Sequence, residues 1–478
     1  MKVKELLHGW EILSAADGVL ETEVSGVCWD SREVRPGDLF VAMTGFAADG
    51  HRFIPQAMAA GAAAVLCQNA PEDGVPFVRV PDSRRALAVV GGNFFGHPAD
   101  AMKMTGVTGT NGKTTTTYLL KEILESTGAK VGLIGTNQNM IGQEAIPTER
   151  TTPESFALQA LLAQMRDGGC THVVMEVSSH ALALDRVYGI PYDVGVFTNL
   201  TQDHLDFHQT MEAYCGAKAI LFRNCRAGVV NADDPWTPRL TEGASCKLLT
   251  YGERAAADLR AEDVSLGMDH VSFTAVYRDS RTPVRVNIPG GFMVYNTLDV
   301  LGAALELGIP IEQSAAVLSR AAHVKGRVEV VPTPGKAYTI LIDYAHSPDS
   351  MVNVLQTVKG FAKGRTIALF GCGGDRDKGK RPKMGLAAAE NADFAIVTTD
   401  NPRTERPGDI IADILPGLEG LGTPYEVVED RVEAIHWAMD HAEPGDVIVL
   451  CGKGHETYQE VGHEKRHMDE REIVRDYL

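Results

Sequence analysis

Several features that would place this chain in a special class of protein are missing from its sequence. No apolar stretch approaches the length needed to cross a membrane, and Met1–Gly9 lacks the apolar core of a secretory signal. The net charge is −18 and no basic block occurs, which argues against nucleic acid as a partner and against a polybasic membrane anchor. We therefore expect a cytoplasmic protein with no membrane insertion.

Cysteine pairs are missing as well. The 8 cysteines among the 478 residues include no CxxC pair, so neither a zinc site nor a disulfide framework is indicated. Cys372 and Cys451 each end an apolar run beside glycines, and we interpret both as reduced residues at strand ends. Hydrophobic residues (44%) and charged residues (23%) have ordinary shares for a globular protein. The length suggests about three domains.

The most informative stretch is residues 107–116, which read Val-Thr-Gly-Thr-Asn-Gly-Lys-Thr-Thr-Thr. An apolar run precedes it and a helical pattern follows it. Gly109 and Gly112 allow tight turns that point backbone N–H groups at an anion. Lys113 can reach the outer phosphates, and the hydroxyl of Thr114 can hold Mg²⁺. The stretch therefore predicts a phosphate loop that binds a nucleoside triphosphate.

The rest of the chain predicts an α/β protein of three parts. Apolar runs alternate with helical patterns after residue 101, which predicts a parallel sheet with crossover helices. Alternating apolar residues at 262–289 predict a small antiparallel insert. A Lys-Gly-Arg segment at 325–327 marks the second boundary. The predicted domains are residues 1–100, 101–328 and 329–478.

The third part repeats one theme, in which an apolar run ends in a polar loop that contains glycine or proline. The apolar runs are Thr339–Ile342, Ile367–Phe370, Phe394–Thr398 and Val447–Leu450. Ligands of open α/β sheets bind beyond the carboxyl ends of the strands, so these loops are predicted to meet at one edge and form a site. The alternative is that they are ordinary solvated loops.

Single residues at other strand ends suggest metal chemistry. Glu176 ends an apolar run, which is a common position for a Mg²⁺ ligand, although an exposed strand-end acid is the alternative. Asp203, His204 and Asp206 crowd another strand end, and His204 is our preferred metal or phosphate contact there. Lys218 lies in an apolar helical segment, and composition alone predicts a surface lysine at that position.

Many short motifs in one order resemble the Mur ligase family of peptidoglycan synthesis over essentially the whole chain. They are Asp30-Ser31-Arg32, G-T-N-G-K-T-T, Arg150-Thr151-Thr152-Pro153, M-E-V-S-S-H, T-Q-D-H-L-D-F-H, Gly326-Arg327-Val328-Glu329, D-Y-A-H-S-P-D, G-C-G-G-D-R-D-K-G-K-R, D-N-P-R and G-K-G-H-E. Folylpolyglutamate synthetase shares the phosphate loop and the general plan, but it is not expected to carry the last two.

The resemblance implies an N-terminal UDP-sugar-binding domain, a central parallel-sheet ATPase domain with the phosphate loop, and a C-terminal Rossmann-like α/β domain that binds an amino acid. It also implies a reaction. ATP phosphorylates a carboxylate of UDP-MurNAc-L-Ala-D-Glu, and the amine of meso-diaminopimelate attacks the acyl phosphate. The implied requirements are Mg²⁺, ATP as co-substrate and CO₂ for carbamylation of Lys218. The partners are these small molecules, and a monomer is expected.

The resemblance also implies a role for each residue of the site. ATP contacts are implied for Gly109, Thr110, Asn111, Gly112, Lys113, Thr114, Thr115, Asn296, Arg327 and Asp343. Contacts to the UDP-sugar peptide are implied for Ser31, Phe46, Ala47, Ala48, Thr151, Thr152, Ser178 and Arg186. Metal ligands or their neighbours are Thr114, Glu176, His204 and Lys218, and the catalytic residues are Lys113, Lys218 and His204. Diaminopimelate contacts are Arg376, Asp400, Asn401, Pro402, Arg403, Gly452 and Glu456.

Two positions depart from the family pattern, and other functions stay open. Leu184 stands where glutamine is often found, and Met293 stands where asparagine is common, near the adenine contact. A lysine-adding ligase of the same family is one alternative, but lysine has no second carboxylate and would leave Arg403 buried without a partner. A non-catalytic nucleotide-binding protein is the other, and such a protein would not need Lys218.

Overall fold

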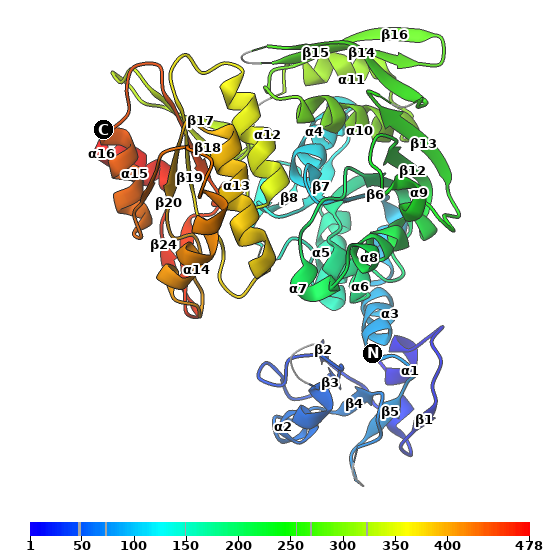
Figure 1. Ribbon diagram of the computed structural model, residues 1–478. Coiled ribbons are helices and arrows are strands. Elements are labelled where there is room, and N and C mark those ends of the chain that lie inside the picture. Colours follow the sequence, from blue (N-terminus) through cyan, green and yellow to red (C-terminus); the bar gives the residue numbers. More distant parts are fainter. Residues whose placement is uncertain (46–48, 72–73, 149, 255, 268–269, 322–323) are drawn as a thin grey trace. The chain divides into compact units, whose positions relative to one another are not determined.

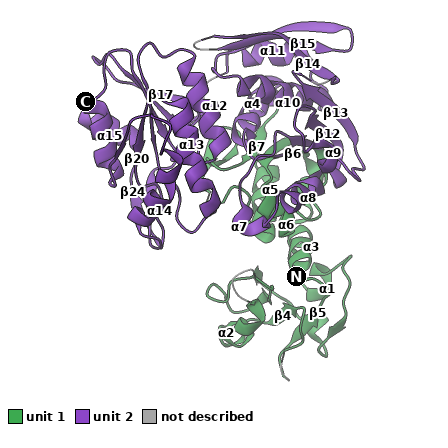
Figure 2. Ribbon diagram, viewed as in Figure 1, with its two compact units in different colours: residues 1–106, 129–193 green, residues 107–128, 194–478 purple. Residues whose placement is uncertain are grey.

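The computed structural model describes residues 1–478 except 46–48, 72–73, 149, 255, 268–269 and 322–323. The chain divides into two compact units, which Figure 2 colours separately. Unit 1 comprises residues 1–106 and 129–193, and unit 2 comprises residues 107–128 and 194–478. The predicted phosphate loop and the whole C-terminal region therefore belong to the same unit.

The N-terminal part of unit 1 is a five-stranded sheet with the order β1-β5-β4-β3-β2. Neighbouring strands from β2 to β5 are parallel, and β1 is antiparallel to β5. Leu39, Leu66 and Val78 belong to its buried core. The elements are α1 (Val3–Leu6), β1 (Ser14–Ala15), β2 (Gly26–Cys28), β3 (Asp38–Val41), α2 (Ile54–Ala59), β4 (Ala64–Cys67) and β5 (Phe77–Arg79).

Helix α3 spans Ser83–Phe95. The carboxylate of Asp82 caps its N-terminus by accepting hydrogen bonds from the N–H groups of Arg84 at 2.9 Å and Arg85 at 3.1 Å. Gly96 ends the helix in the left-handed conformation, with φ of 68°. The ring of Phe94 packs against Phe156 of α5 (Ser155–Asp167), so the two helices share an apolar contact.

The remaining strands of unit 1 carry Glu176 to the end of a buried strand. β7 (Val131–Ile134) pairs in parallel with β10 (His172–Glu176), as the alternation of apolar runs and helices predicts. β8 (Asn139–Ile141) and β9 (Glu144–Ile146) form an antiparallel hairpin beside β7, which was not predicted from the sequence. Helix α6 (Ser179–Ala183) follows β10.

Unit 2 begins within β6 (Lys103–Thr108), and the phosphate loop connects this strand to helix α4 (Lys113–Ser126). β12 (Cys225–Asn231) and β13 (Lys247–Gly252) are parallel. β14 (Leu259–Leu266), β15 (Val271–Tyr277) and β16 (Ser280–Val286) are antiparallel, so the predicted insert is confirmed. The other elements are β11 (Tyr192–Phe197), α7 (Leu205–His208), α8 (Met211–Arg223), α9 (Thr237–Leu240), α10 (Phe292–Glu306) and α11 (Ile311–Leu318).

The C-terminal region of unit 2 is a sheet with the order β17-β18-β22-β19-β20-β21, shown from yellow to red in Figure 1. Only β17 is antiparallel to its neighbour among these described strands. The strands are β17 (Glu329–Val331), β18 (Thr339–Asp343), β19 (Thr366–Phe370), β20 (Phe394–Val397), β21 (Tyr425–Val427) and β22 (Val447–Cys451). A hairpin of β23 (Tyr458–Val461) and β24 (Glu464–His467) follows.

Helices cover both faces of this C-terminal sheet. Met351 of α12 (Pro348–Lys359) and Met384 of α13 (Arg381–Asn391) belong to one core cluster, together with α14 (Pro407–Ile414). Ile435 of α15 (Arg431–Asp440) and Val474 of α16 (Glu470–Tyr477) belong to a second cluster. A parallel sheet between two helical layers is the predicted Rossmann-like arrangement. The predicted domain limits of 1–100, 101–328 and 329–478 stay a prediction.

Candidate functional site

The phosphate loop has a backbone that only glycine fits at two positions. Gly109 has φ of 149° and Gly112 has φ of 90°. A Cβ atom on Gly109 would lie 1.8 Å from Oγ1 of Thr198, and one on Gly112 would lie 2.5 Å from Oδ1 of Asn296. Both glycines are therefore required by conformation and by space.

Residues that follow β11 hold the loop in shape. The N–H of Asn111 donates to Oδ1 of Asn199 at 2.9 Å, and the N–H of Thr110 donates to the carbonyl of Asn199 at 2.8 Å. The hydroxyl of Thr198 donates to the carbonyl of Asn111 at 2.6 Å. Asn199 therefore belongs to the functional site as a residue that holds the phosphate loop in shape, a role that was not predicted from the sequence.

Two lysines meet at the same backbone carbonyl of the loop. Nζ of Lys113 donates to the carbonyls of Gly109 at 2.9 Å and Thr110 at 2.8 Å, and Nζ of Lys218 donates to Gly109 at 2.8 Å. Lys218 is buried, so the surface position predicted from composition alone is wrong. Burial, followed by the charge of Lys113, holds the pKa of Lys218 well below its usual value. The neutral amine of Lys218 is thereby favoured.

A buried carboxylate with basic neighbours lies after β11. Oδ2 of Asp203 is 3.5 Å from Nε2 of His204 and 3.6 Å from Nε2 of His346, and Oδ1 is 3.5 Å from Nζ of Lys380. Burial favours the neutral acid, but these neighbours outweigh it and hold the pKa of Asp203 well below its usual value. Asp206 of the predicted trio is exposed instead.

A cavity of about 650 Å³ adjoins the phosphate loop within unit 2. Its walls include the predicted nucleotide contacts Asn111, Gly112, Thr115, Asn296, Arg327 and Asp343. Nη2 of Arg327 donates to the hydroxyl of Thr114 at 3.0 Å, and its guanidinium lies 5.0 Å from the ring centre of Tyr344. A cavity of this size with a few convergent polar groups is typical of a small-molecule site.

The side chains in the walls of this cavity are held by further contacts. Oδ2 of the buried Asp343 accepts a hydrogen bond from the N–H of Val328 at 2.8 Å, and burial raises the pKa of Asp343. The amide of Asn296 contacts the sulfur of Met293 at 3.8 Å. Met293 therefore lies at the predicted adenine contact, where it presents sulfur in place of an amide.

The four polar loops of the C-terminal sheet gather at one edge, as predicted. The N–H of Gly452 after β22 donates to the carbonyl of Asp343 in β18 at 3.0 Å. Nη1 of Arg403 after β20 donates to the carbonyl of Gly374 after β19 at 2.8 Å. A Cβ atom on Gly452 would lie 2.4 Å from Oδ2 of Asp400, so these two loops touch as well.

A buried polar network joins two of these loops. Nδ2 of Asn401 donates to Oε2 of Glu456 at 3.0 Å. Nζ of Lys453, which is fully buried, donates to Oδ1 of Asn401 at 2.8 Å and to Oε2 of Glu456 at 2.7 Å. The structure thus brings together two predicted diaminopimelate contacts and a lysine that the sequence analysis left without a role.

Arg403 is partly enclosed and already paired. Its side chain is 19% exposed, and Nε donates to Oε2 of Glu460 at 2.9 Å. We expected Arg403 to lack a partner when the bound amino acid has no second carboxylate. This expectation is wrong, because the carboxylate of Glu460 already pairs with Arg403. Pro402 is buried beside it, and Nη1 of Arg376 donates to the carbonyl of Asp375 at 3.0 Å.

Unit 1 holds a second group of predicted residues around Glu176. The Glu176 side chain is buried, and it accepts hydrogen bonds from the N–H and the hydroxyl of Thr136, both at 2.9 Å. The alternative of an exposed strand-end acid is therefore wrong. The Thr151 hydroxyl lies 3.0 Å from that of Thr136, and the Thr152 hydroxyl donates to the carbonyl of Glu176 at 2.8 Å.

Two of the other predicted contacts to the UDP-sugar peptide form hydrogen bonds with Thr152. The N–H of Ser178 donates to the hydroxyl of Thr152 at 3.2 Å, and Nη1 of Arg186 donates to the Thr152 carbonyl at 3.3 Å. The buried Ser31 instead donates to the side chain of Gln56 at 3.1 Å. Leu184 ends helix α6. The predicted contacts Phe46, Ala47 and Ala48 lie outside the described residues.

The described residues contain no group of three or more His, Cys, Asp or Glu side chains arranged to hold a metal ion. The predicted Mg²⁺ ligands differ from such a group, because they include a threonine hydroxyl and a lysine that is expected to be modified. No described helix has the length and apolar character to cross a membrane.

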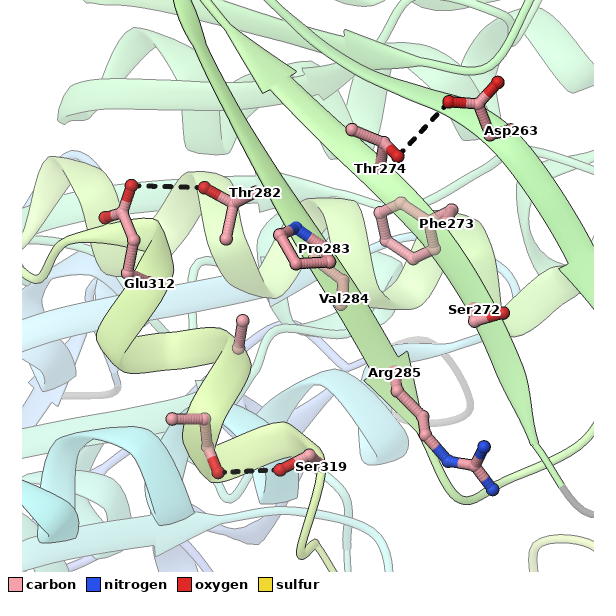
Figure 3. A pocket seen from close by; sticks show the side chains of 12 residues that line it. Asp263, Ser272, Phe273, Thr274, Thr282, Pro283, Val284, Arg285, Glu312 and Ser319 are labelled. Atoms are coloured by element: carbon pink, nitrogen blue, oxygen red, sulfur yellow. Dashed lines mark hydrogen bonds between the residues drawn. The ribbon is translucent and has the colours of Figure 1, made fainter.

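A second cavity, of about 640 Å³, lies between the insert strands and helix α11 (Figure 3). Several of its polar side chains are paired. The hydroxyl of Thr274 donates to Asp263 at 3.3 Å, and that of Thr282 donates to Glu312 at 3.1 Å. The described residues that line it include none of the predicted site residues.

Family models match most of the chain. Residues 23–94 match a model described as Mur ligase family, catalytic domain. Residues 107–304 match the Mur ligase middle domain, and residues 326–454 match the Mur ligase, glutamate ligase domain. The matched segments cover both the phosphate loop and the four C-terminal loops.

Relatives match over their full length. The chain is 45% identical to UDP-N-acetylmuramoyl-L-alanyl-D-glutamate--2,6-diaminopimelate ligase 1 of Clostridium acetobutylicum, with 100% of this chain and 99% of the relative covered. The ligase of the same name from Caldanaerobacter subterraneus is 46% identical with the same coverage. A solved structure of a ligase so named is 33% identical, with a TM-score of 0.70 and 100% and 98% of the chains covered.

A more distant solved structure shares the fold. It is the MurF ligase from Thermotoga maritima in complex with ADP, which is 20% identical. The TM-score is 0.65, and 95% of this chain and 97% of that chain are covered.

Proposed function

The chain belongs to the Mur ligase family, and from this premise we propose that it joins meso-diaminopimelate to UDP-MurNAc-L-Ala-D-Glu in an ATP-dependent, amide-forming reaction. The observation that carries the proposal is the composition of unit 2, which holds a phosphate loop, an adjoining cavity and the four polar loops of the C-terminal sheet. The names of the relatives support the choice of these substrates.

The first step is phosphorylation of a substrate carboxylate. A carboxylate is a poor electrophile, and transfer of the γ-phosphoryl group from ATP gives it a leaving group. The loop residues Gly109 to Thr115 would hold the phosphates through N–H groups, with Lys113 on the transferred group. Asn296, Arg327 and Asp343 would contact the nucleoside and phosphates, which their positions in the cavity walls support.

Mg²⁺ would be held by Thr114, Glu176, His204 and a carbamylated Lys218. When bound, it neutralises phosphate charge. The oxygen donors of this set suit the ion, because Mg²⁺ prefers oxygen ligands and Thr114, Glu176 and a carbamate all supply them. The pKa of Lys218 supports the modification, since its depression favours the neutral amine that reacts with CO₂. In that step nitrogen bonds to carbon, and one proton leaves.

The second step is attack by the amine of the amino acid on the acyl phosphate, which releases inorganic phosphate. We propose that Arg403 and Arg376 bind the two carboxylates of diaminopimelate, with Asp400, Asn401 and Pro402 shaping the pocket. Glu456 and the backbone of Gly452 would hold the distal ammonium. Burial of Asn401 and of much of Arg403 supports this assignment, because a partly dry pocket strengthens charged hydrogen bonds.

The UDP-sugar peptide would bind to unit 1 through Ser31, Phe46 to Ala48, Thr151, Thr152, Ser178 and Arg186. The contacts of Thr152 with Ser178 and Arg186 support part of that group. We propose that the enzyme works in the cytoplasm as a monomer, with domains at residues 1–100, 101–328 and 329–478. Its acyl phosphate must be shielded from water while the amine attacks.

One assay tests the proposal against its alternatives. ADP release is measured with UDP-MurNAc-L-Ala-D-Glu, ATP, Mg²⁺ and either meso-diaminopimelate or L-lysine. We expect release with diaminopimelate and at least a 10²-fold lower kcat/KM with lysine. Equal use of lysine would refute the choice of amino acid. ATP binding without any ADP release would point to a non-catalytic nucleotide-binding protein.

A further inference from the structure

Lys453 is a fully buried cation in the loop after β22, and each of its two hydrogen bonds reaches a residue of the proposed amino-acid site. Its Nζ donates to Oδ1 of Asn401 at 2.8 Å and to Oε2 of Glu456 at 2.7 Å. It also lies 5.3 Å from the ring centre of Tyr458. A buried ammonium requires such partners, so its place in the fold is strictly defined.

The first consequence concerns the amide of Asn401. Its Oδ1 accepts from Lys453 and from the N–H of Glu460, both at 2.8 Å. Oxygen therefore faces Lys453, and Nδ2 faces Glu456 at 3.0 Å. An amide has nearly the same shape after a half-turn, so only its hydrogen bonds choose the orientation. Lys453 and the N–H of Glu460 thus together fix which end of Asn401 a ligand meets.

The second consequence concerns the carboxylate of Glu456. Oε2 accepts both the ammonium of Lys453 and the amide of Asn401, while Oε1 has no donor among the described residues. The carboxylate is held in one orientation and is already paired with a cation. It would attract a lone ligand ammonium less strongly than an unpaired carboxylate would.

The loop that carries Lys453 is anchored on both sides by the C-terminal helix α16. Glu470 pairs with Arg431 at 2.8 Å, and Arg431 donates to the carbonyl of Cys451 at 2.8 Å. Arg471 donates to the carbonyl of Gly454 at 2.9 Å. Both flanks of Lys453 are therefore fixed, so its ammonium has little freedom to follow a ligand.

We propose that Lys453 is a positioning residue that selects an amino acid with a zwitterionic far end over one with a lone ammonium. This inference rests on the proposed function. The pairs Lys453–Glu456 and Arg403–Glu460 each join one cation and one anion. A ligand end that brings both an ammonium and a carboxylate finds a partner in each pair. A ligand that brings only an ammonium meets the carboxylate of Glu456, which Lys453 already neutralises. Loss of Lys453 would leave the negative charge of Glu456 available to that ammonium.

The test is the variant Lys453→Met, which keeps the apolar stem and removes the ammonium. In the ADP-release assay we expect the ratio of kcat/KM for meso-diaminopimelate to that for L-lysine to fall at least 10-fold. The change should come mainly from the KM of the amino acid, with the KM of ATP unchanged. Lys465→Met is the matched control, because the exposed Lys465 lies 4.4 Å from the ring centre of the same Tyr458 and should leave the ratio unchanged.

A second variant separates positioning from folding. Lys453→Met/Glu456→Gln removes both charges of this ion pair, and it should melt close to the wild-type temperature while still showing a reduced ratio. A Lys453→Met enzyme with a wild-type ratio would overturn the inference, and so would loss of the folded state in both variants. Absence of any diaminopimelate-dependent ADP release by the wild type would instead refute the proposed function.

Discussion

Replacing Arg403 with alanine tests the amino-acid site most directly. The guanidinium already donates through Nε to Glu460 at 2.9 Å and through Nη1 to the carbonyl of Gly374 at 2.8 Å. The Nη2 group has no acceptor among the described residues, and it is the part that remains for a ligand carboxylate. The change Arg403→Ala removes this donor and leaves Glu460 without its partner.

The magnitude follows from the number of bonds lost. A hydrogen bond to a charged group contributes about 1.5–3 kcal/mol, and the side chain is enclosed enough to expect the upper half of that range. Loss of one such bond and weakening of a second would reduce the binding free energy of diaminopimelate by about 2–4 kcal/mol. At about 1.4 kcal/mol per factor of ten, the KM for meso-diaminopimelate should rise ~30- to 1000-fold.

The assay is steady-state ADP release at varied diaminopimelate and at varied ATP. The KM of ATP should stay within about twofold of the wild-type value, because the nucleotide contacts lie in other loops. Arg406→Ala is the control, since Arg406 is an exposed arginine of the same segment. A change of less than fivefold in the diaminopimelate KM for Arg403→Ala, with a normal fold, would refute the reasoning.

Further changes test the phosphate loop, the proposed modification of Lys218 and the ion pair between the buried Arg381 and Glu405. Lys113→Ala should lower kcat by orders of magnitude, and near wild-type turnover would refute the loop's role. Lys218→Ala should be nearly inactive and partly restored by a short carboxylic acid; no restoration would count against a carbamate. Hydrogen bonds from Arg381 lower the pKa of Glu405 to about 2 from 4.5. Glu405 should therefore add stability above pH 4.5 that is lost as the pH falls toward 2. Urea unfolding of Glu405→Gln checks this, and a difference from wild type that does not shrink with falling pH would contradict it.

Much of the site could be predicted because its signals are local. Gly109, Gly112 and Lys113 stand at the spacing of a phosphate loop. The structure gives both glycines the positive φ values that such a loop requires. The meeting of four loops at one sheet edge also followed from the sequence, since the carboxyl ends of parallel strands share an edge.

Other features could not be predicted because they depend on pairing between distant residues. Composition alone placed Lys218 at the surface, whereas the fold buries it against Gly109, which is 109 residues earlier in the chain. The partner of Arg403 is Glu460, on a hairpin whose short strands β23 and β24 have mostly exposed or half-buried residues and little apolar pattern. Neither contact leaves a periodic signal in the sequence.

The sequence by itself determined the class of the fold, the phosphate loop and the resemblance to the Mur ligase family. Each of these depends on residue types at short spacing, where backbone geometry limits the possible structures. Only the tertiary structure decided which charges are buried and what they face: Lys453 against Asn401 and Glu456, and Lys218 beside Lys113. The physical reason is that the energy of a charge depends on its surroundings, and those surroundings come from segments far apart in the chain.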